Sequence, residues 1–244
     1  MLMLNNFDFT YWRKQPVAGV GWEVRCMKSI MPILFFTALV ILMPRFLNAQ
    51  QSLDFEQSSL GEIPKDWKIE ATKHREPLAT WKIIRDETVS SGKQVLALTN
   101  VSHGSGGTFN LCWTGTIQFK DGEIEVGFRA VDGYVDQGGG PIWRVQDANN
   151  YYIARVNPLE DNFRVYYVKN GSRRQLASAR VKAPSEVWHT IKIVHQGRKI
   201  IGHFNGQKLI EIEDDTFPLA GGIGLWTKAD AVTSFDDFSI ILKD

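Results

Sequence analysis

Short runs of alternating polar and apolar residues, separated by turn-forming residues, fill most of the chain after residue 50. The run G-E-I-E-V-G-F-R-A-V, residues 122–131, alternates regularly and predicts a strand with one face in water. Further strands are predicted over residues 52–56, 81–84, 94–99, 141–146, 151–156, 163–168, 173–177, 188–195, 199–204, 208–212, 221–226 and 234–242. Helical periodicity is almost absent. Strands this short, at this spacing, are typical of an all-β sandwich or barrel.

The turn residues between these runs predict hairpins. Asn170-Gly171 and Asn205-Gly206 provide the positive φ angles of tight two-residue turns, and residues 196–198 connect two further strands. Hairpins imply antiparallel pairing, and a single sheet of about a dozen strands usually splits into two packed layers. The sequence therefore predicts one all-β domain over residues 50–244, a two-sheet antiparallel β-sandwich of jelly-roll type.

The first 49 residues have a different pattern. Lys28 precedes a 14-residue apolar run, residues 30–43, and the small residue Ala49 closes the segment. This order predicts a signal peptide over residues 27–49, cleaved after Ala49. The run is shorter than the about 20 residues of a stable membrane span, although an uncleaved anchor or a buried helix is the alternative. We interpret residues 1–26 as an upstream extension ahead of a start at Met27, and we expect a secreted or periplasmic protein.

Removing residues 1–49 takes away five basic and two acidic side chains, which leaves 23 Lys and Arg against 25 Asp and Glu. This balance argues against a nucleic-acid partner, and the pair Arg173-Arg174 is expected on a solvated face. Cys112 is the one cysteine left, so no internal disulfide can form, and we expect it to be a small buried residue. The core alone must therefore stabilise a domain of about 195 residues, which is long enough to do so.

The stretch W-R-V-Q-D-A-N-N-Y-Y-I-A-R, residues 143–155, combines arginine and aromatic side chains on two predicted strands. Such side chains suit a sugar, because arginine is a planar multidentate donor and an aromatic ring can cover a C–H patch. Strand alternation assigns Trp143, Val145, Tyr152, Ala154 and Val156 to the core. The opposite face, expected in solvent, carries the candidate ligand-binding residues Arg144, Gln146, Tyr151, Arg155 and Asn157.

Trp226, Lys228 and Asp230 are candidates for the rim of the same site, although Trp226 also fits the core because it ends an apolar strand. The arginine and tyrosine side chains fit equally well a second interpretation, in which they form cross-strand pairs that only stabilise a sheet. The sequence leaves both interpretations open.

Glu123 and Glu125 are candidate catalytic carboxylates. They are two residues apart on a predicted strand, so they point the same way at about 6.6 Å. Retaining and inverting glycosidases use carboxyl separations of about 5–5.5 and 6.5–9.5 Å, and side-chain freedom makes either reachable. The alternative is two glutamates on a solvated strand face.

A metal site is not predicted. His189, His195 and His203 lie on one expected hairpin, but its turn places Lys192 or a neighbour opposite His203, which disfavours a three-histidine zinc site. The pairs Asp214-Asp215 and Asp236-Asp237 are consecutive in sequence, so their members point to opposite faces of a strand. We expect no cofactor.

Five segments carry a family resemblance. They are G-G-P-I-W-R-V-Q-D-A-N-N-Y-Y-I-A-R, Y-Y-V-K-N-G-S-R-R-Q-L-A, W-H-T-I-K-I, F-N-G-Q-K-L-I-E-I-E-D and G-G-I-G-L-W-T-K-A-D-A-V-T-S-F-D-D-F. In this order they resemble exported bacterial domains of the concanavalin A-like lectin/glucanase superfamily, in particular the 3-keto-disaccharide hydrolase-like or family-16 glycosidase-like domain. Laminin-G-like domains share the fold. The resemblance covers most of residues 53–242, implies a concanavalin A-like jelly roll, and allows a structural calcium ion.

The resemblance leaves the activity open. The family-16 motif resembles E-I-D-x-x-E, and the matching residues 123–128 end in Phe128, whose ring cannot protonate a leaving group. We therefore expect a lectin-like domain that binds carbohydrate or a cell-surface polysaccharide without turnover. The group also includes enzymes, so a glycoside hydrolase or lyase acting on a modified disaccharide is the first alternative. A laminin-G-like protein-interaction module is the second.

Overall fold

A computed structural model describes residues 50–74, 76–89, 92–101 and 107–243, which lie within one compact unit. The predicted signal peptide and the residues before it, 1–49, lie outside the described residues. The strands are β1 (Gln50–Leu53), β2 (Lys68–Ala71), β3 (Thr80–Arg85), β4 (Gln94–Asn100), β5 (Phe109–Phe119), β6 (Asp121–Asp132), β7 (Gly139–Asp147), β8 (Asn150–Asn157), β9 (Asn162–Lys169), β10 (Ser172–Arg180), β11 (Trp188–Gln196), β12 (Lys199–Phe204), β13 (Gln207–Glu213), β14 (Gly221–Lys228) and β15 (Val232–Lys243). Two short 3-10 helices, η1 (Thr72–His74) and η2 (Pro158–Glu160), connect strands.

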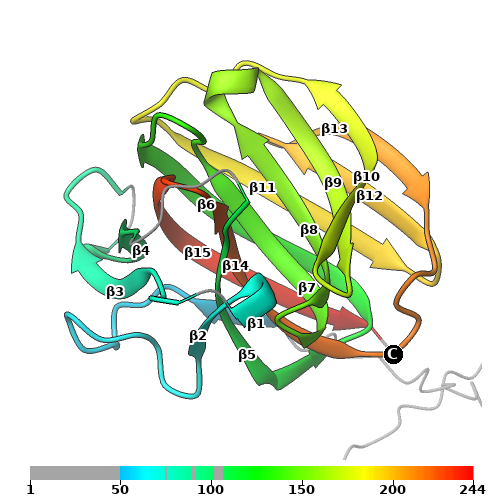
Figure 1. Cartoon of the computed structure of the whole chain (residues 1–244), viewed down its shortest axis with the longest axis horizontal. Helices are drawn as coiled ribbons and strands as arrows, with labels where there is room; N and C mark the ends of the chain where they lie inside the picture. The colour runs from blue at the N-terminus through cyan, green and yellow to red at the C-terminus, as the bar shows by residue number, and fades with distance from the viewer. Residues whose placement is uncertain (1–49, 75, 90–91, 102–106, 244) are drawn as a thin grey trace, which may run out of the picture. The chain divides into compact units, whose positions relative to one another are not determined.

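The strands form two antiparallel sheets (Figure 1). Sheet A has the order β13-β12-β11-β6-β15-β4-β3, and β1 pairs with β15 beside it. Sheet B has the order β10-β9-β8-β7-β14-β5-β2. This arrangement confirms the predicted all-β, two-sheet antiparallel sandwich.

The core lies between the sheets and follows the alternation of the sequence. Ile124, Val126 and Phe128 of β6 are fully buried, while the intervening residues of β6 are half-buried. Trp143 and Tyr152 stack in the same core with ring centroids 5.5 Å apart. Apolar burial of this kind is worth roughly 25 cal/mol per Å², and it is the main stabilising contribution in a domain without disulfides.

The predicted hairpin turns are present. Asn170 and Gly171 have φ angles of 50° and 71°, and Asn205 and Gly206 have φ angles of 47° and 79°. Lys192 pairs with His203, as the predicted turn requires. Local turn chemistry therefore determined the register of these strands.

Two strands of sheet B, β2 and β5, were not predicted. β5 reads F-N-L-C-W-T-G-T-I-Q-F and pairs with β14 and β2. Its first six residues are all buried, because both faces of this strand are covered. A strand covered on both faces has no polar-apolar alternation, so the sequence lacked the usual signal. Cys112 of β5 is buried and free, as predicted.

A bulge in β7 breaks the predicted alternation. Arg144 has a φ of 47°, and the pairing of β7 shifts register with both of its neighbours. Ile142 and Val145, three residues apart, consequently lie on the same outer face of sheet B. The assignment of Val145 to the inter-sheet core was therefore wrong, whereas Trp143, Tyr152, Ala154 and Val156 lie there as predicted.

The outer face of sheet B carries a second apolar cluster. Its members are Phe109, Leu111, Trp113, Ile142, Val145, Tyr151, Ile153, Val168 and Trp226. At one end η1 covers this face, because Thr72 Oγ1 lies 2.7 Å from the Tyr151 hydroxyl and donates to the carbonyl of Ala148. At the other end the face is polar.

Candidate functional site

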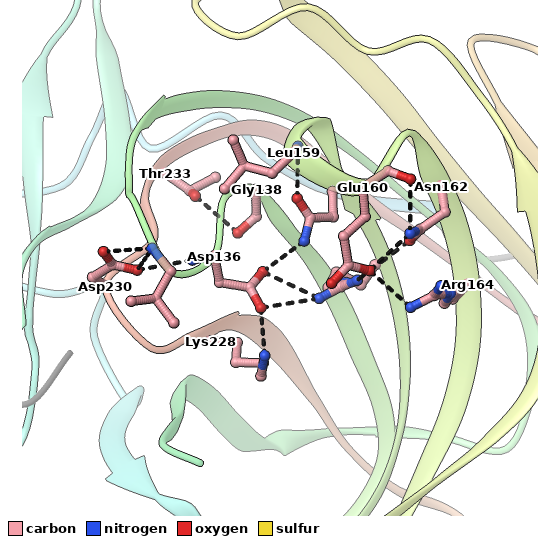
Figure 2. Close-up of polar contacts among 12 residues, drawn as sticks. Asp136, Gly138, Leu159, Glu160, Asn162, Arg164, Lys228, Asp230 and Thr233 are labelled. Carbon is pink, nitrogen blue, oxygen red and sulfur yellow. Dashed lines mark hydrogen bonds and ion pairs between the residues drawn. The ribbon is translucent and has the colours of Figure 1, made fainter. Parts of the chain in front are cut away.

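Asp136 is the centre of a polar network on the outer face of sheet B (Figure 2). The residue is 1% exposed, and its carboxylate accepts hydrogen bonds from Arg155 Nη1 at 3.1 and 3.2 Å and from Asn157 Nδ2 at 3.0 Å. Lys228 Nζ lies 2.6 Å from its second oxygen. A buried carboxylate is costly unless it is paired and hydrogen-bonded, and three donors provide that compensation here.

Strand periodicity and one loop bring these residues together. Arg155 and Asn157 are two apart on β8, so they share the face opposite the core residues Ala154 and Val156. The loop before β7 places Asp136 above them, and Gly138 ends that loop with a φ of 72°. A Cβ at Gly138 would lie 2.3 Å from the carbonyl of Val156, so only glycine permits this approach.

Glu160 extends the network along the same face. Its carboxylate binds Arg155 Nη2 at 2.9 Å, Arg164 Nη1 at 2.8 Å and Asn162 Nδ2 at 2.8 Å. Burial alone would raise the pKa of Glu160, but the Asn162 hydrogen bond and the charges of the two arginines hold it below the ordinary value. Glu160 is therefore ionised at neutral pH.

Asp230 fixes the loop that carries Asp136. Its carboxylate accepts the backbone N–H groups of Tyr134, Val135 and Asp136 at 2.7 to 3.0 Å. Burial tends to raise the pKa of Asp230, and these hydrogen bonds lower it below its usual value. Tyr134, two residues before Asp136 on this loop, is 93% exposed, so its ring lies in solvent.

The accessible part of the site consists of Tyr134 and the charged side chains of Lys228, Arg164 and Glu160, which are 15%, 30% and 42% exposed. Asp136, Arg155 and Asn157 are buried and hold these groups in place. The arrangement combines an exposed ring on the Asp136 loop with fixed donors and one acceptor, and these are the group types that recognise a polyhydroxylated molecule.

The structure brings together several predicted site residues. Arg155, Asn157 and Lys228 meet at Asp136, and Asp230 accepts the backbone N–H of Asp136. Tyr151 and Trp226 share the same face but belong to its apolar cluster. The prediction that Arg155, Asn157 and Tyr151 are exposed was wrong: each is at most 1% exposed, because other parts of the chain cover the face.

Arg144 lies apart from this site and was also wrongly predicted to be exposed. Its guanidinium is buried and donates to the backbone carbonyls of Lys120 at 2.8 Å, Phe217 at 2.7 Å and Gly197 at 3.1 Å. The bulge turned its side chain to this position. Gln146 is exposed as predicted and donates to the carbonyl of Ala220.

Glu123 and Glu125 lie on the outer face of sheet A, opposite to the Asp136 network. Lys192 Nζ is 2.6 Å from Glu123 and 3.9 Å from Glu125, and Lys243 Nζ is 2.9 Å from Glu123. Hydrogen bonds from Lys192 and Lys243 lower the pKa of Glu123. The two carboxylates thus belong to a charged ladder on a strand face, which is the alternative that alternation allowed.

Asp136, Tyr134 and Glu160 were missed in the sequence analysis. Asp136 and Tyr134 belong to the glycine-rich segment D-G-Y-V-D-Q-G-G-G-P, residues 132–141, which joins β6 to β7. One aromatic residue, Tyr134, and two acids, Asp132 and Asp136, in this loop could have indicated a functional site. Binding residues are often found on loops that a rigid scaffold positions.

The residues that the structure describes contain no group of three or more His, Cys, Asp or Glu side chains able to hold a metal ion. Within the same residues, no helix is long and apolar enough to cross a membrane.

Comparison with solved structures places this sandwich among jelly-roll domains. The carbohydrate-binding module CBM66 from Bacillus subtilis aligns with a TM-score of 0.54 at 19% identity, covering 71% of this chain and 94% of the module. A Bacillus subtilis protein with a galectin-like fold gives 0.51 at 16% identity, covering 73% and 91%. Domain 4 of AbnA, a GH43 extracellular arabinanase from Geobacillus stearothermophilus solved with arabinotriose, gives 0.51 at 11% identity, covering 80% and 91%.

These identities are low, so the likeness establishes the fold, and it confirms the predicted jelly roll. No curated protein sequence matches the chain. The family model for the 3-keto-alpha-glucoside-1,2-lyase-like domain matches residues 55–241, which agrees with the resemblance seen in the sequence. Because this match spans almost all of the sandwich, the chain belongs to the family of 3-keto-alpha-glucoside-1,2-lyase-like domains.

Proposed function

We propose that this domain binds carbohydrate on the outer face of sheet B, at the Asp136 network. The observation that carries the proposal is the exposed ring of Tyr134 on the loop that Asp230 fixes. The same loop carries Asp136, whose network includes the partly exposed side chains of Lys228, Arg164 and Glu160. Structural neighbours with the same fold include a carbohydrate-binding module and a domain solved with arabinotriose, which supports a carbohydrate ligand.

Glycan-array binding of the purified protein tests the proposal. Tyr134→Ala removes the exposed ring without touching the core, and we expect about tenfold weaker binding at an unchanged melting temperature. Leu219→Ala is the matched control, because Leu219 is also exposed, at 68%, but lies in the connection before β14. Equal binding by the wild type and Tyr134→Ala, or silence on a broad array, would count against this site.

The family description favours a second function, a lyase acting on a 3-keto-glucoside. In such an elimination a base takes the proton from C2, which the neighbouring ketone acidifies, and the C1–O bond breaks with the leaving oxygen taking up a proton. Glu160 is the carboxylate of this site with the most exposed side chain, at 42%, so we assign it as the candidate base in this alternative. Its low pKa makes it a weak base, and we therefore rank binding first.

Incubation with a 3-keto-α-glucoside separates the two functions. A lyase releases the leaving alcohol and an unsaturated ketosugar, and Glu160→Gln should abolish release. Glu123→Gln and Glu125→Gln should leave it unchanged, because both residues lie on the other sheet. Release that survives Glu160→Gln would exclude Glu160 as the base.

We also propose that the protein is exported, as the segment of residues 27–49 indicates. Expression in a bacterium that processes signal peptides should yield a periplasmic or secreted protein whose first residue is Gln50. Full-length protein retained in the cytoplasm would contradict the proposal.

A further inference from the structure

Arg173 of β10 has an unusual environment on the outer face of sheet B, where it lies against the apolar cluster. The sequence predicts a solvated pair Arg173-Arg174, but only Arg174 is exposed, whereas Arg173 is half-buried. The Arg173 guanidinium lies over three rings, 4.4 Å from the centroid of Tyr166, 5.1 Å from Phe109 and 5.8 Å from Trp226. The guanidinium is thus held flat on an aromatic surface.

Arg173 differs from the other cations of this face in its charge balance. Arg155 pairs with Asp136 and Glu160, Arg164 pairs with Glu160, and Lys228 pairs with Asp136. Arg173 forms no ion pair with any residue that the structure describes, and its Nη1 is buried without a hydrogen-bond partner. Burial lowers the pKa of Arg173; Tyr166, Asp136 and Glu160 act in the opposite direction, and the charge of Arg155 adds to the lowering.

One buried neighbour also has an unused hydrogen-bonding atom. The Nε of Arg155 has no hydrogen-bond partner in the described part of the chain, whereas the Tyr166 hydroxyl interacts with the side chain of Arg164. Arg155 and Tyr166 are 1% and 3% exposed, and the guanidinium of Arg155 lies 6.0 Å from the Tyr166 ring centroid. Unpartnered buried donors are costly, and Arg173 holds a charge that no described carboxylate meets at ion-pair distance. An anionic group that docks on the accessible part of the Arg173 side chain would supply this missing pairing.

We propose that Arg173 forms an anion subsite for a carboxylate or sulfate group carried by a saccharide, so that the ligand is an acidic glycan. The inference rests on the proposed carbohydrate-binding function and specifies its ligand class. Arg173 lies over Trp226, and Lys228 follows two residues later on β14, about 7 Å away by strand rise. One saccharide can therefore contact both Arg173 and Lys228. A planar guanidinium suits both anionic groups because its fork matches their paired oxygens.

Titration calorimetry of the purified protein with matched saccharide pairs tests this inference. The probes are polygalacturonate, alginate and chondroitin sulfate fragments, each compared with its carboxyl-reduced or desulfated form. We expect at least one acidic fragment to bind about tenfold or more tightly than its neutral counterpart, with a preference that weakens as salt is raised. Inorganic sulfate alone is the control for a bare-anion site.

Arg173→Gln should bring the acidic-to-neutral ratio close to one, while Arg174→Gln, which removes the same charge from the adjacent exposed position, should preserve it. The wild-type comparison needs no variant, so the inference can be judged even if Arg173→Gln unfolds. Equal binding of acidic and neutral forms overturns the anion subsite but leaves the proposed function standing. Binding of no saccharide overturns both. If inorganic sulfate binds as tightly as the acidic saccharides, the anion need not be carried by a saccharide, and the acidic-glycan ligand is overturned.

Discussion

Arg144 and Arg155 are both buried arginines, but different groups satisfy them. Three backbone carbonyls from separate segments accept hydrogen bonds from Arg144, which also pairs with Asp121 at 3.4 Å. Arg155 instead relies on the carboxylates of Asp136 and Glu160, at 3.1 and 2.9 Å. Arg144 therefore connects the chain to itself and presents no free donor fork. At this scale the difference between a structural and a recognition residue lies in what accepts its hydrogen bonds, which strand position alone cannot reveal.

Arg144→Met should destabilise the domain strongly. The change leaves buried carbonyls without donors, and we expect a loss of about 2–4 kcal/mol in the free energy of unfolding. Urea denaturation measures it. Arg198→Met is the control, because the Arg198–Asp215 pair is exposed and should contribute less than about 1 kcal/mol. Equal effects of the two changes would contradict a structural role for Arg144.

Among the elements, β5 and β14 approach each other so closely that one position of β14 has no room for a side chain. Gly224 of β14 pairs with Trp113 of β5, and a Cβ at Gly224 would lie 2.3 Å from Trp113 Cβ and 2.5 Å from the carbonyl of Cys112. The glycine is needed for space here, because backbone and tryptophan occupy the position that a side chain would take.

Gly224→Ala should consequently disturb the β5–β14 pairing, with a loss of about 2 kcal/mol or more in the free energy of unfolding. Gly115→Ala in β5 is the matched control, since its nearest atom is 3.8 Å away, and we expect a change below about 1 kcal/mol. Thermal denaturation distinguishes the two variants. If Gly224→Ala leaves the stability unchanged, β5 and β14 can move apart at no cost in free energy, which would contradict this prediction.

For the whole molecule, the buried groups His195 and Asp236 contribute to the pH dependence of stability in opposite directions. Burial and then the charge of Arg144 lower the pKa of His195 to about 4, while Trp143 Nε1 donates to its Nδ1. The unfolded histidine titrates near 6.5, so its stabilising contribution is complete above about pH 6.5 and is lost as the pH falls toward 4. Burial and then nearby acids raise the pKa of Asp236 to about 7. Its contribution is complete below the unfolded value of about 4 and is lost as the pH rises through 7.

Asp236→Asn should therefore increase the free energy of unfolding by about 1–3 kcal/mol at pH 8 and by less at pH 5, because it removes a buried carboxylate whose Oδ1 has no partner among the described residues. Because Asp236 no longer offsets the effect of His195, the stability of the variant should fall steeply below pH 6.5. Denaturation at several pH values measures both effects, with the exposed Asp215→Asn as control. A variant less stable than wild type at pH 8 would show that the carboxylate has a favourable partner.

The sequence by itself determined the sandwich. Alternation along β6 and β8 and the two Asn-Gly turns are local signals, because they depend on strand period and backbone angles within a few residues. These signals also assigned Arg155 and Asn157 correctly to the face opposite the core. They failed for β5, which is covered on both sides, and at Arg144, where a bulge reverses the alternation.

Only the tertiary structure decided what covers each face and which distant residues meet on it. Asp136 joins Arg155 across 19 residues of chain and Lys228 across 92, and η1 covers Tyr151 from 79 residues away. Alternation states on which side of a strand a side chain lies, but whether that side is open depends on segments that a local pattern does not contain. For this reason the sequence identified Arg155, Asn157 and Lys228 as candidates, whereas the folded chain revealed Asp136 as their centre.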